Sequence, residues 1–232
     1  MKNEAGVCET ARIFDQIARS RRSIRGFLPE QVDASVLEQV FTTAAFAPSN
    51  CNTQPWFSHV VSGAVRDRLS QRFMQTIGQG VHSLDFPYEA KYDGEHRKRQ
   101  LDVGILLYQA LGVSRDDKEG KRRAFLRNLE FFDAPHVVFI FMPDWCGIRE
   151  ACDVGMYAQN LMLTMQAHGI ASCPQTILGY DADSVRQELD IDATMKLLFG
   201  ISFGYEDSAL PENQILPERA ELPQLVQFHT GY

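Results

Sequence analysis

The chain carries, near its start, Arg21-Arg22-Ser23-Ile24-Arg25-Gly26-Phe27, and the interpretation of the whole sequence begins there. Three arginines and one serine fall within five residues. The planar fork of donors on arginine fits phosphate oxygens, and a serine hydroxyl can donate to the same oxygens. A solvated run of charges is the alternative, and for three arginines taken alone it is the better reading. The stretch therefore predicts an anion site only where other segments support it.

Two further segments supply that support. About 25 residues on comes Ala47-Pro48-Ser49-Asn50-Cys51-Asn52-Thr53-Gln54-Pro55-Trp56, a cluster of short amides and hydroxyls closed by a Pro-Trp pair. Near the far end, Arg219 lies in a proline-flanked tail that we expect to be extended.

Together these segments resemble the nitroreductase family of flavin mononucleotide (FMN) enzymes. The family signature is Arg-Arg/His-Ser-x-Arg/Lys near the N-terminus, then Ala/Ser-Pro-Ser-x-x-Asn-x-Gln-Pro-Trp one helix later, with a phosphate-binding arginine in the tail. The resemblance runs from about Ile13 to the last residues. It implies an α+β fold, with a small mixed or antiparallel sheet packed among helices. It also implies an intertwined homodimer with an extended C-terminal tail and shared flavin sites.

The resemblance assigns FMN-binding roles to the arginine segment and to the tail. Arg21, Ser23 and Arg219 are the candidates for the phosphate. Arg22 and Arg25 are the candidates for the ring edge near N1 and O2, where a fixed cation favours the reduced flavin.

The second segment matches the family segment that reaches the flavin of the other subunit. Its candidate residues are Pro48, Ser49, Asn50 and Asn52. Cys51 lies among them, and a nucleophilic cysteine is the alternative, although no histidine with a matching motif supports it.

A third segment, residues 174–179, begins at the end of the strand expected at 170–176 and matches the family segment whose backbone lies along the flavin. One N–H there would donate to N5 of the ring. Its candidates are Pro174, Gln175, Thr176, Leu178 and Gly179. Taken alone, the segment would be an ordinary strand end followed by a turn.

The tail departs from the family pattern at one position. Many members carry a second basic residue five positions before the tail arginine, and this chain has Gln214 there. Glu218 also lies beside Arg219. Both differences make the phosphate role of Arg219 less secure than that of Arg21.

The resemblance implies a ping-pong reaction in which NAD(P)H reduces the flavin and a nitroaromatic or quinone-type acceptor then takes the electrons. The flavin carries the chemistry, so no catalytic side chain is named. One alternative is a sibling flavoenzyme, such as a reductive dehalogenase or a flavin-cleaving enzyme. Another is a non-catalytic flavin-binding protein.

The acceptor pocket is expected to be built from a lid-like insertion at about 78–98. This stretch has no helical period, yet it contains Phe86, Tyr88 and Tyr92, and aromatic residues favour a lid over disorder. The side chains of Phe125, Phe131 and Phe132 could line the pocket, or they could belong to the core.

Composition excludes several other classes of protein. The net charge of −7 argues against a nucleic-acid binder. The longest apolar run, 137–142, is too short to cross a bilayer. Five cysteines without paired spacing, behind an N-terminus that lacks the apolar core of a signal peptide, predict reduced thiols and a cytoplasmic protein. No histidine or cysteine spacing predicts a metal site.

The 232 residues are expected to form one domain, 1–232, with helices outnumbering strands. The expected helices are 10–20, 33–46, 64–77, 99–113, 117–132, 149–168 and 181–189, and the expected strands are 57–61, 136–142, 170–176 and 195–203. Thr10 is expected to cap the first helix, and Ser35 with Glu38 has capping-box spacing in the second. Basic residues 121, 122, 123 and 127 are read as a solvated helix face.

Overall fold

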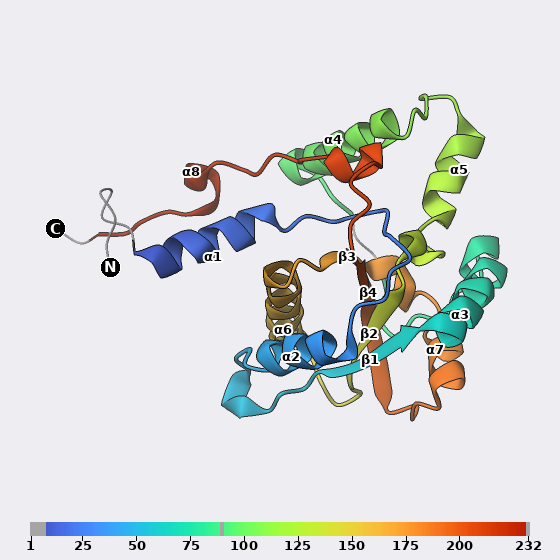
Figure 1. The fold of residues 1–232 in the computed structure, drawn as a ribbon, viewed down its shortest axis with the longest axis horizontal. Helices are drawn as coiled ribbons and strands as arrows, with labels where there is room; N and C mark the ends of the chain where they lie inside the picture. Colours follow the sequence, from blue (N-terminus) through green and yellow to red (C-terminus); the bar gives the residue numbers. More distant parts are fainter. Residues whose placement is uncertain (1–7, 89–90, 231–232) are drawn as a thin grey trace.

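A computed structural model describes residues 8–88 and 91–230, and predictions that concern 1–7, 89–90 or 231–232 lie outside the described residues. Figure 1 shows a small sheet surrounded by helices, which confirms the predicted α+β class. The helices are α1 Glu9–Ser20, α2 Ala34–Ala44, α3 Gly63–Gln75, α4 Gly94–Ala110, α5 Lys118–Leu126, α6 Ile148–Ala167, α7 Ala182–Leu189 and α8 Leu222–Leu225. The strands are β1 Phe57–Ser62, β2 His136–Pro143, β3 Ala171–Gln175 and β4 Met195–Gly204.

The four strands form one antiparallel sheet in the order β1-β2-β4-β3. Seven of the eight residues of β2 are buried, as expected for a central strand covered on both faces. Its side chains alternate between two clusters, since successive residues of a strand point to opposite faces. Val137, Phe139 and Phe141 pack with α3 and α7. Val138, Ile140 and Met142 pack with α2 and α6.

Several predicted boundaries are wrong for identifiable reasons. The sulfur of Cys8, not Thr10, caps α1, and the Asp33 carboxylate caps α2 by accepting from the Ser35 N–H at 2.7 Å. The helix predicted at 99–113 begins earlier, at Gly94. The helix predicted at 117–132 ends at Leu126, and the chain continues through turns at 127–130 into left-handed residues that begin at Phe131.

The arginine segment runs along the free edge of β3. Ser23 forms a parallel bridge with Ser172, and the Ile24 N–H donates to the Ser172 carbonyl at 3.1 Å. Further on, the Leu28 N–H donates to the Tyr205 carbonyl just after β4. These bonds fix residues 21–28 against the sheet, so the segment is part of the fold and not a solvated loop.

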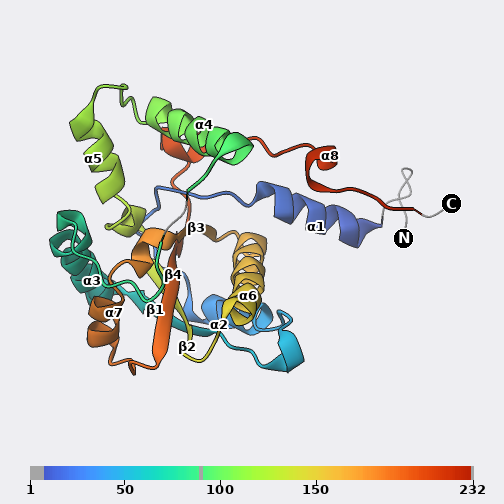
Figure 2. The same ribbon diagram turned by 180° about the vertical axis from the view of Figure 1, so that it is seen from behind.

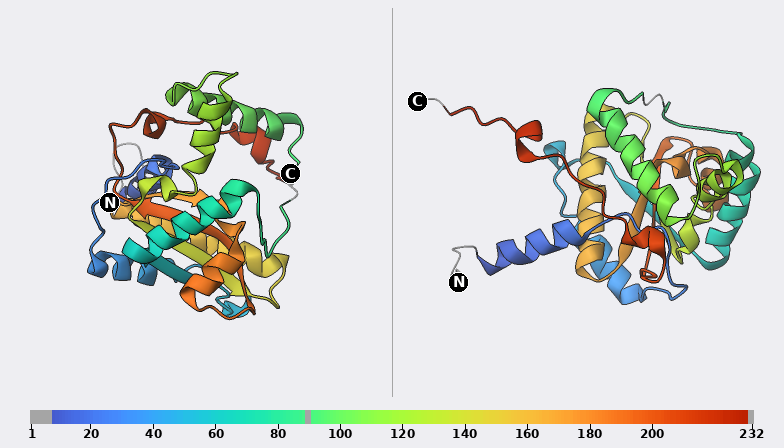
Figure 3. Two further views of the ribbon diagram at one scale, coloured as in Figure 1. Left: turned by 90° about the vertical axis from the view of Figure 1, so that its right-hand side faces the viewer. Right: turned by 90° about the horizontal axis from the view of Figure 1, so that it is seen from above.

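Two apolar arms project from the body to the same side. One arm is α1, which has no buried residue and exposes Ile13 and Phe14. The other is the tail around α8, which exposes Leu222, Leu225 and Phe228. Figure 3 shows both arms leaving the body together, and Figure 2 shows the same from behind, with α5 on the opposite flank of the molecule.

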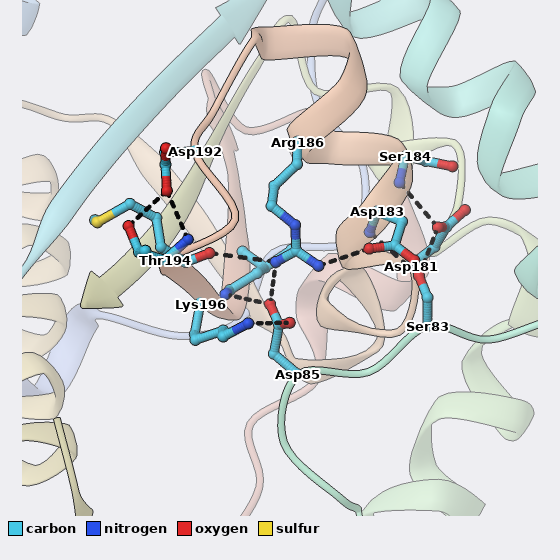
Figure 4. A network of polar contacts seen from close by, with 11 residues as sticks. Ser83, Asp85, Asp181, Asp183, Ser184, Arg186, Asp192, Thr194 and Lys196 are labelled. Atoms are coloured by element: carbon cyan, nitrogen blue, oxygen red, sulfur yellow. Dashed lines mark hydrogen bonds and ion pairs between the residues drawn. The ribbon is translucent and has the colours of Figure 1, made fainter. Parts of the chain in front are cut away.

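The first part of the predicted lid-like insertion is tied to the body by a polar network (Figure 4). Asp85, whose side chain is 6% exposed, accepts from Arg186 Nη1 at 2.6 Å and from the Leu197 N–H at 2.7 Å. Nearby, Asp181 accepts from the hydroxyls of Thr76 and Ser83. Burial alone would raise the pKa of Asp181, but hydrogen bonds from Ser184, Thr76 and Ser83 outweigh it and lower that pKa. Ser83 and Asp85, in the first part of the insertion, are therefore held against the body of the protein.

Within the described residues, none of the helices has the length and apolar character needed to cross a membrane.

The network in Figure 4 predicts a large difference between two substitutions that each remove one carboxylate from Arg186. Asp85→Asn should lower the free energy of unfolding by about 3 kcal/mol, because it leaves a buried guanidinium facing a neutral amide. Asp183→Asn is the matched control. Since Asp183 is 59% exposed, its loss should cost less than about 1 kcal/mol. Urea denaturation of both variants measures the difference, and equal losses would contradict this account of the network.

His136 predicts a pH dependence of stability. It is buried, its Nε2 accepts from the Val32 N–H at 3.0 Å, and burial lowers its pKa. The folded protein thus binds fewer protons than the unfolded chain, so stability is lost as pH falls below the unfolded value of about 6.5. The free energy of unfolding should therefore drop between pH 7 and pH 5. His136→Gln, whose amide oxygen can accept the same bond without titrating, should show a smaller drop, and an equal drop would refute the assignment.

Candidate functional site

Arg21 and Arg219 place two positive charges close together. Arg21 ends α1 and is half-buried. Burial lowers its pKa, and the positive charge of Arg219 lowers it further. Arg219 donates to the carbonyls of Pro217 and Glu218, and within residues 8–88 and 91–230 neither guanidinium pairs with a carboxylate. Like charges at this spacing favour an anion between them.

Ser23 and Arg25 complete a cluster around Cys173 on β3. Burial raises the pKa of the Cys173 thiol to about 11, while Arg25, the Ser23 hydroxyl and Arg21 act in the opposite direction. The thiol is therefore neutral at physiological pH and does not itself compensate the arginine charges. The structure thus brings together four of the five residues from which the sequence predicts a phosphate and ring-edge site: Arg21, Ser23, Arg25 and Arg219.

Arg22 is directed to the tail. Its Nη2 pairs with Glu206 at 2.5 Å, and its Nε donates to the Asn213 carbonyl at 3.0 Å. Two of its donor nitrogens are thus committed to holding the C-terminal segment against the arginine segment. The predicted contact of Arg22 with a flavin ring edge stays a prediction, and among the described residues its Nη1 makes no hydrogen bond.

Asn213, which the sequence did not indicate as a site residue, holds the arginine segment and the C-terminal tail together. It is 1% exposed, its Oδ1 accepts from the Arg25 N–H at 2.7 Å, and its Nδ2 donates to the Gly26 carbonyl at 2.8 Å. At Gly26, a Cβ would lie 2.1 Å from a methyl carbon of Leu210, so the segment and the tail are in direct contact. Gln214, at the position where the sequence departs from the family pattern, donates to the Ser208 carbonyl.

The third predicted segment lies at the end of β3, beside the arginine cluster. Pro174 and Thr176 are exposed, whereas Gln175 is buried and its amide is committed to Asn128 and Ser202. This alternation leaves one face of the segment free for a ligand.

Leu178 and Gly179 have packing roles in this segment. A Cβ at Gly179 would lie 2.8 Å from the Leu198 carbonyl oxygen, and the Leu178 side chain covers Gly200. Both contacts press the turn Thr176–Gly179 onto β4. At Leu178 and Gly179, any ligand contact therefore comes from the backbone.

The second predicted segment is fixed to the other end of α6. The Asn50 N–H donates to the buried carboxylate of Asp153 at 3.0 Å, and Trp56 stacks on Tyr157 with ring centroids 4.9 Å apart. Cys51 and Asn52 have φ values of 50° and 56°, a left-handed conformation that few non-glycine residues adopt. The resulting turn exposes Pro48, Asn50 and Asn52, with Ser49 partly covered because its hydroxyl accepts from the Gln54 N–H.

These two ends of α6 are far apart. Asn50 is tied to Asp153 near the start of the helix, while Ser23 pairs with Ser172, just beyond its end. With a rise of 1.5 Å per residue, the intervening helix separates them by roughly 20 Å. Figure 1 shows the same separation: the segment around residue 50 lies below α2, and the arginine segment lies above the sheet. Within one chain, the two predicted FMN-binding segments do not meet.

The aromatic residues expected in an acceptor pocket have different environments. Phe131 is fully buried among Phe73 and Phe139, so it belongs to the core. Phe125 is exposed. Phe132 lines a cavity of about 200 Å³ together with Arg25, and so only this aromatic of the three borders the arginine cluster.

The chain matches the model of the Nitroreductase family over residues 18–205. It is 42% identical to nitroreductase NfnB of Mycolicibacterium smegmatis, over 95% of this chain and 94% of that protein. It is also 31% identical to a nitrobenzene nitroreductase of Ectopseudomonas oleovorans, over 94% of this chain and 98% of the relative.

The fold matches a crystal structure described as the FMN-dependent nitroreductase NfnB from Mycobacterium smegmatis in complex with NADPH. The TM-score is 0.92 at 42% identity, and the match covers 96% of this chain and all of the other. Shared sequence over 188 residues and a shared fold lead to one conclusion: the chain belongs to the nitroreductase family.

Proposed function

We propose that this protein is an FMN-dependent oxidoreductase that passes electrons from NAD(P)H to nitroaromatic or quinone-type acceptors by a ping-pong mechanism. Family membership and the similarity to FMN- and NADPH-dependent nitroreductases support the chemistry. The observation that carries the proposal is the Arg21–Arg219 pair, two close guanidiniums without a carboxylate partner in the described part of the chain.

The residues present fit FMN. The phosphate requires positive charge and hydroxyl donors, which Arg21, Arg219 and Ser23 provide. The ring edge requires a cation near N1 and O2. Arg25 can supply it, because its guanidinium makes only one bond to a described residue, a 3.3 Å bond to the Ser23 carbonyl. The backbone of Thr176–Gly179 offers the N–H donors proposed for N5.

When bound, FMN accepts a hydride from NAD(P)H and supplies electrons to the acceptor. The side chains of the protein then have binding roles: Arg21, Ser23 and Arg219 hold the phosphate, and Arg25 places positive charge at the ring edge. Arg22 secures the tail that carries Arg219. No side-chain acid or base is assigned.

We further propose that the protein works as a homodimer in which each flavin site is shared. The segment Pro48–Asn52 lies roughly 20 Å from the arginine cluster of its own chain, so it is assigned to the flavin of a second copy. The exposed apolar side chains of α1 and of the tail around α8 provide a surface for that copy to cover. Free thiols at all five cysteines support the cytoplasm as the compartment.

One preparation tests the function and the assembly. The purified protein should be yellow or become so with FMN, and NADPH should bleach it under anaerobic conditions. Aerobic NADPH oxidation should require a nitroaromatic such as 4-nitrobenzoate or a quinone.

Light scattering should give twice the 26.3 kDa chain mass. Colourless protein that cannot take up FMN would end the proposal. Dehalogenation or flavin cleavage without nitroaromatic turnover would assign the protein a sibling reaction instead. A monomer with full activity would refute the shared flavin site.

A further inference from the structure

Three consecutive residues between α5 and β2 adopt a left-handed conformation. Phe131, Phe132 and Asp133 have φ values of 58°, 56° and 65°. For L-amino acids other than glycine this conformation costs about 1–2 kcal/mol per residue. Such strain persists only where the surrounding structure enforces it, and it often marks a functional position.

The surroundings of this left-handed turn enforce its conformation. Phe131 is fully buried, with its ring 5.9 Å from Phe73 and 6.4 Å from Phe139. Arg66 closes the turn from outside, because it donates to the carbonyls of Glu130 and Ala134 while its guanidinium lies 5.3 Å from the centre of the Phe131 ring. Burial and these hydrogen bonds offset the backbone strain.

The left-handed turn directs Asp133 back toward the end of α5. Its carboxylate pairs with Arg127 Nη2 at 3.2 Å, and the same Nη2 donates to the Arg25 carbonyl at 3.1 Å. Arg127 was predicted to be part of a solvated basic helix face. That prediction is wrong for this residue, because its side chain is only 32% exposed and reaches the arginine segment.

The next residue along the chain contacts the other ring-binding segment. The backbone carbonyl and side-chain oxygen of Asn128 accept from Gln175 Nε2 at 3.1 and 3.3 Å. The Gln175 oxygen in turn accepts from the Ser202 hydroxyl. Two consecutive residues, Arg127 and Asn128, therefore join the backbone of Arg25 to the end of β3.

We propose that Arg127, braced by Asp133, is a positioning residue that sets where the Arg25 charge lies relative to the flavin ring. This inference rests on the proposed function. The neighbouring residue, Asn128, binds Gln175 in the segment proposed to contact N5. Arg127 and Asn128 together therefore hold Arg25 and that segment at a constant spacing. The phosphate site at Arg21 and Arg219 lies outside this unit, since no hydrogen bond or ion pair among the described residues joins it to Arg127.

The effect of displacing Arg25 is electrostatic. A fixed cation beside the ring favours electron uptake, and its contribution depends on its distance from the ring. Without the bond from Arg127, the Arg25 carbonyl has no partner among the described residues, and the Arg25 N–H keeps its bond to Asn213. The guanidinium then occupies a wider range of positions, which weakens its effect on the ring but leaves the phosphate contacts intact.

Arg127→Gln in the FMN-loaded full-length protein tests this role. The reduction potential of the bound FMN should become more negative, and the anaerobic rate of reduction by NADPH should fall roughly 10- to 100-fold, the range for a misplaced catalytic group. The dissociation constant for FMN should change by less than about threefold, because the phosphate residues are unaltered. Asp133→Asn, which keeps a residue that tolerates the left-handed conformation, should shift the potential in the same direction by a smaller amount.

Arg123→Gln is the matched control, because Arg123 is exposed on the same helix and makes no side-chain bond to a described residue. It removes the same charge and should leave the potential unchanged. If Arg127→Gln gives the potential of the Arg123→Gln control, the inference is overturned. Should Arg127→Gln fail to fold, a wild-type potential in Asp133→Asn overturns it instead. Wild-type protein that binds no FMN would refute the proposed function itself, a result distinct from either of these.

Discussion

The approach of the Arg21 and Arg219 guanidiniums, at the end of α1 and in the tail, is the interaction on which the proposed site depends. One guanidinium ends α1 and the other lies in the tail, and burial already disfavours the charge of Arg21. The chain holds this arrangement through bonds that do not involve the two guanidiniums: Ser23 with Ser172, Arg22 with Glu206, and Asn213 with the Arg25 N–H. An anion bound between the two charges would relieve the repulsion between them, so the phosphate binding that we propose would also stabilise the fold.

The long helix α6 is the reason why the proposed site needs a second chain. Its first turns carry Asp153 and Tyr157, which fix the polar segment around Asn50, and its far end leads into the β3 strand beside Ser23. A helix is a rigid spacer, so these two segments cannot approach each other within one subunit. A second copy, seated against the exposed arms, would bring its own Asn50 segment to the arginine cluster and complete the site.

Much of this architecture could be predicted from the sequence. The continuous apolar run from Val137 to Met142 marks the central strand, and the arginine motif, the Pro-Ser-Asn segment and the tail arginine predict the family. The left-handed turn at Phe131 could not be predicted, because no glycine or asparagine signals it and long-range aromatic packing enforces it. The roles of Asn213 and Arg127 were missed for a related reason. Their partners lie more than 100 residues away in the sequence, and no local pattern indicates such bonds.

The central claim is that guanidiniums bind the phosphate of the flavin, and comparing the affinities of FMN and riboflavin tests it most directly. The two ligands share the ring and the ribityl chain and differ only in the phosphate. Fluorescence titration of the flavin-free protein should give a dissociation constant at least about 100-fold lower for FMN, since two or more charge-assisted hydrogen bonds depend on that group. The difference should shrink in Arg21→Gln. Equal affinities for FMN and riboflavin in the wild-type protein would contradict the account.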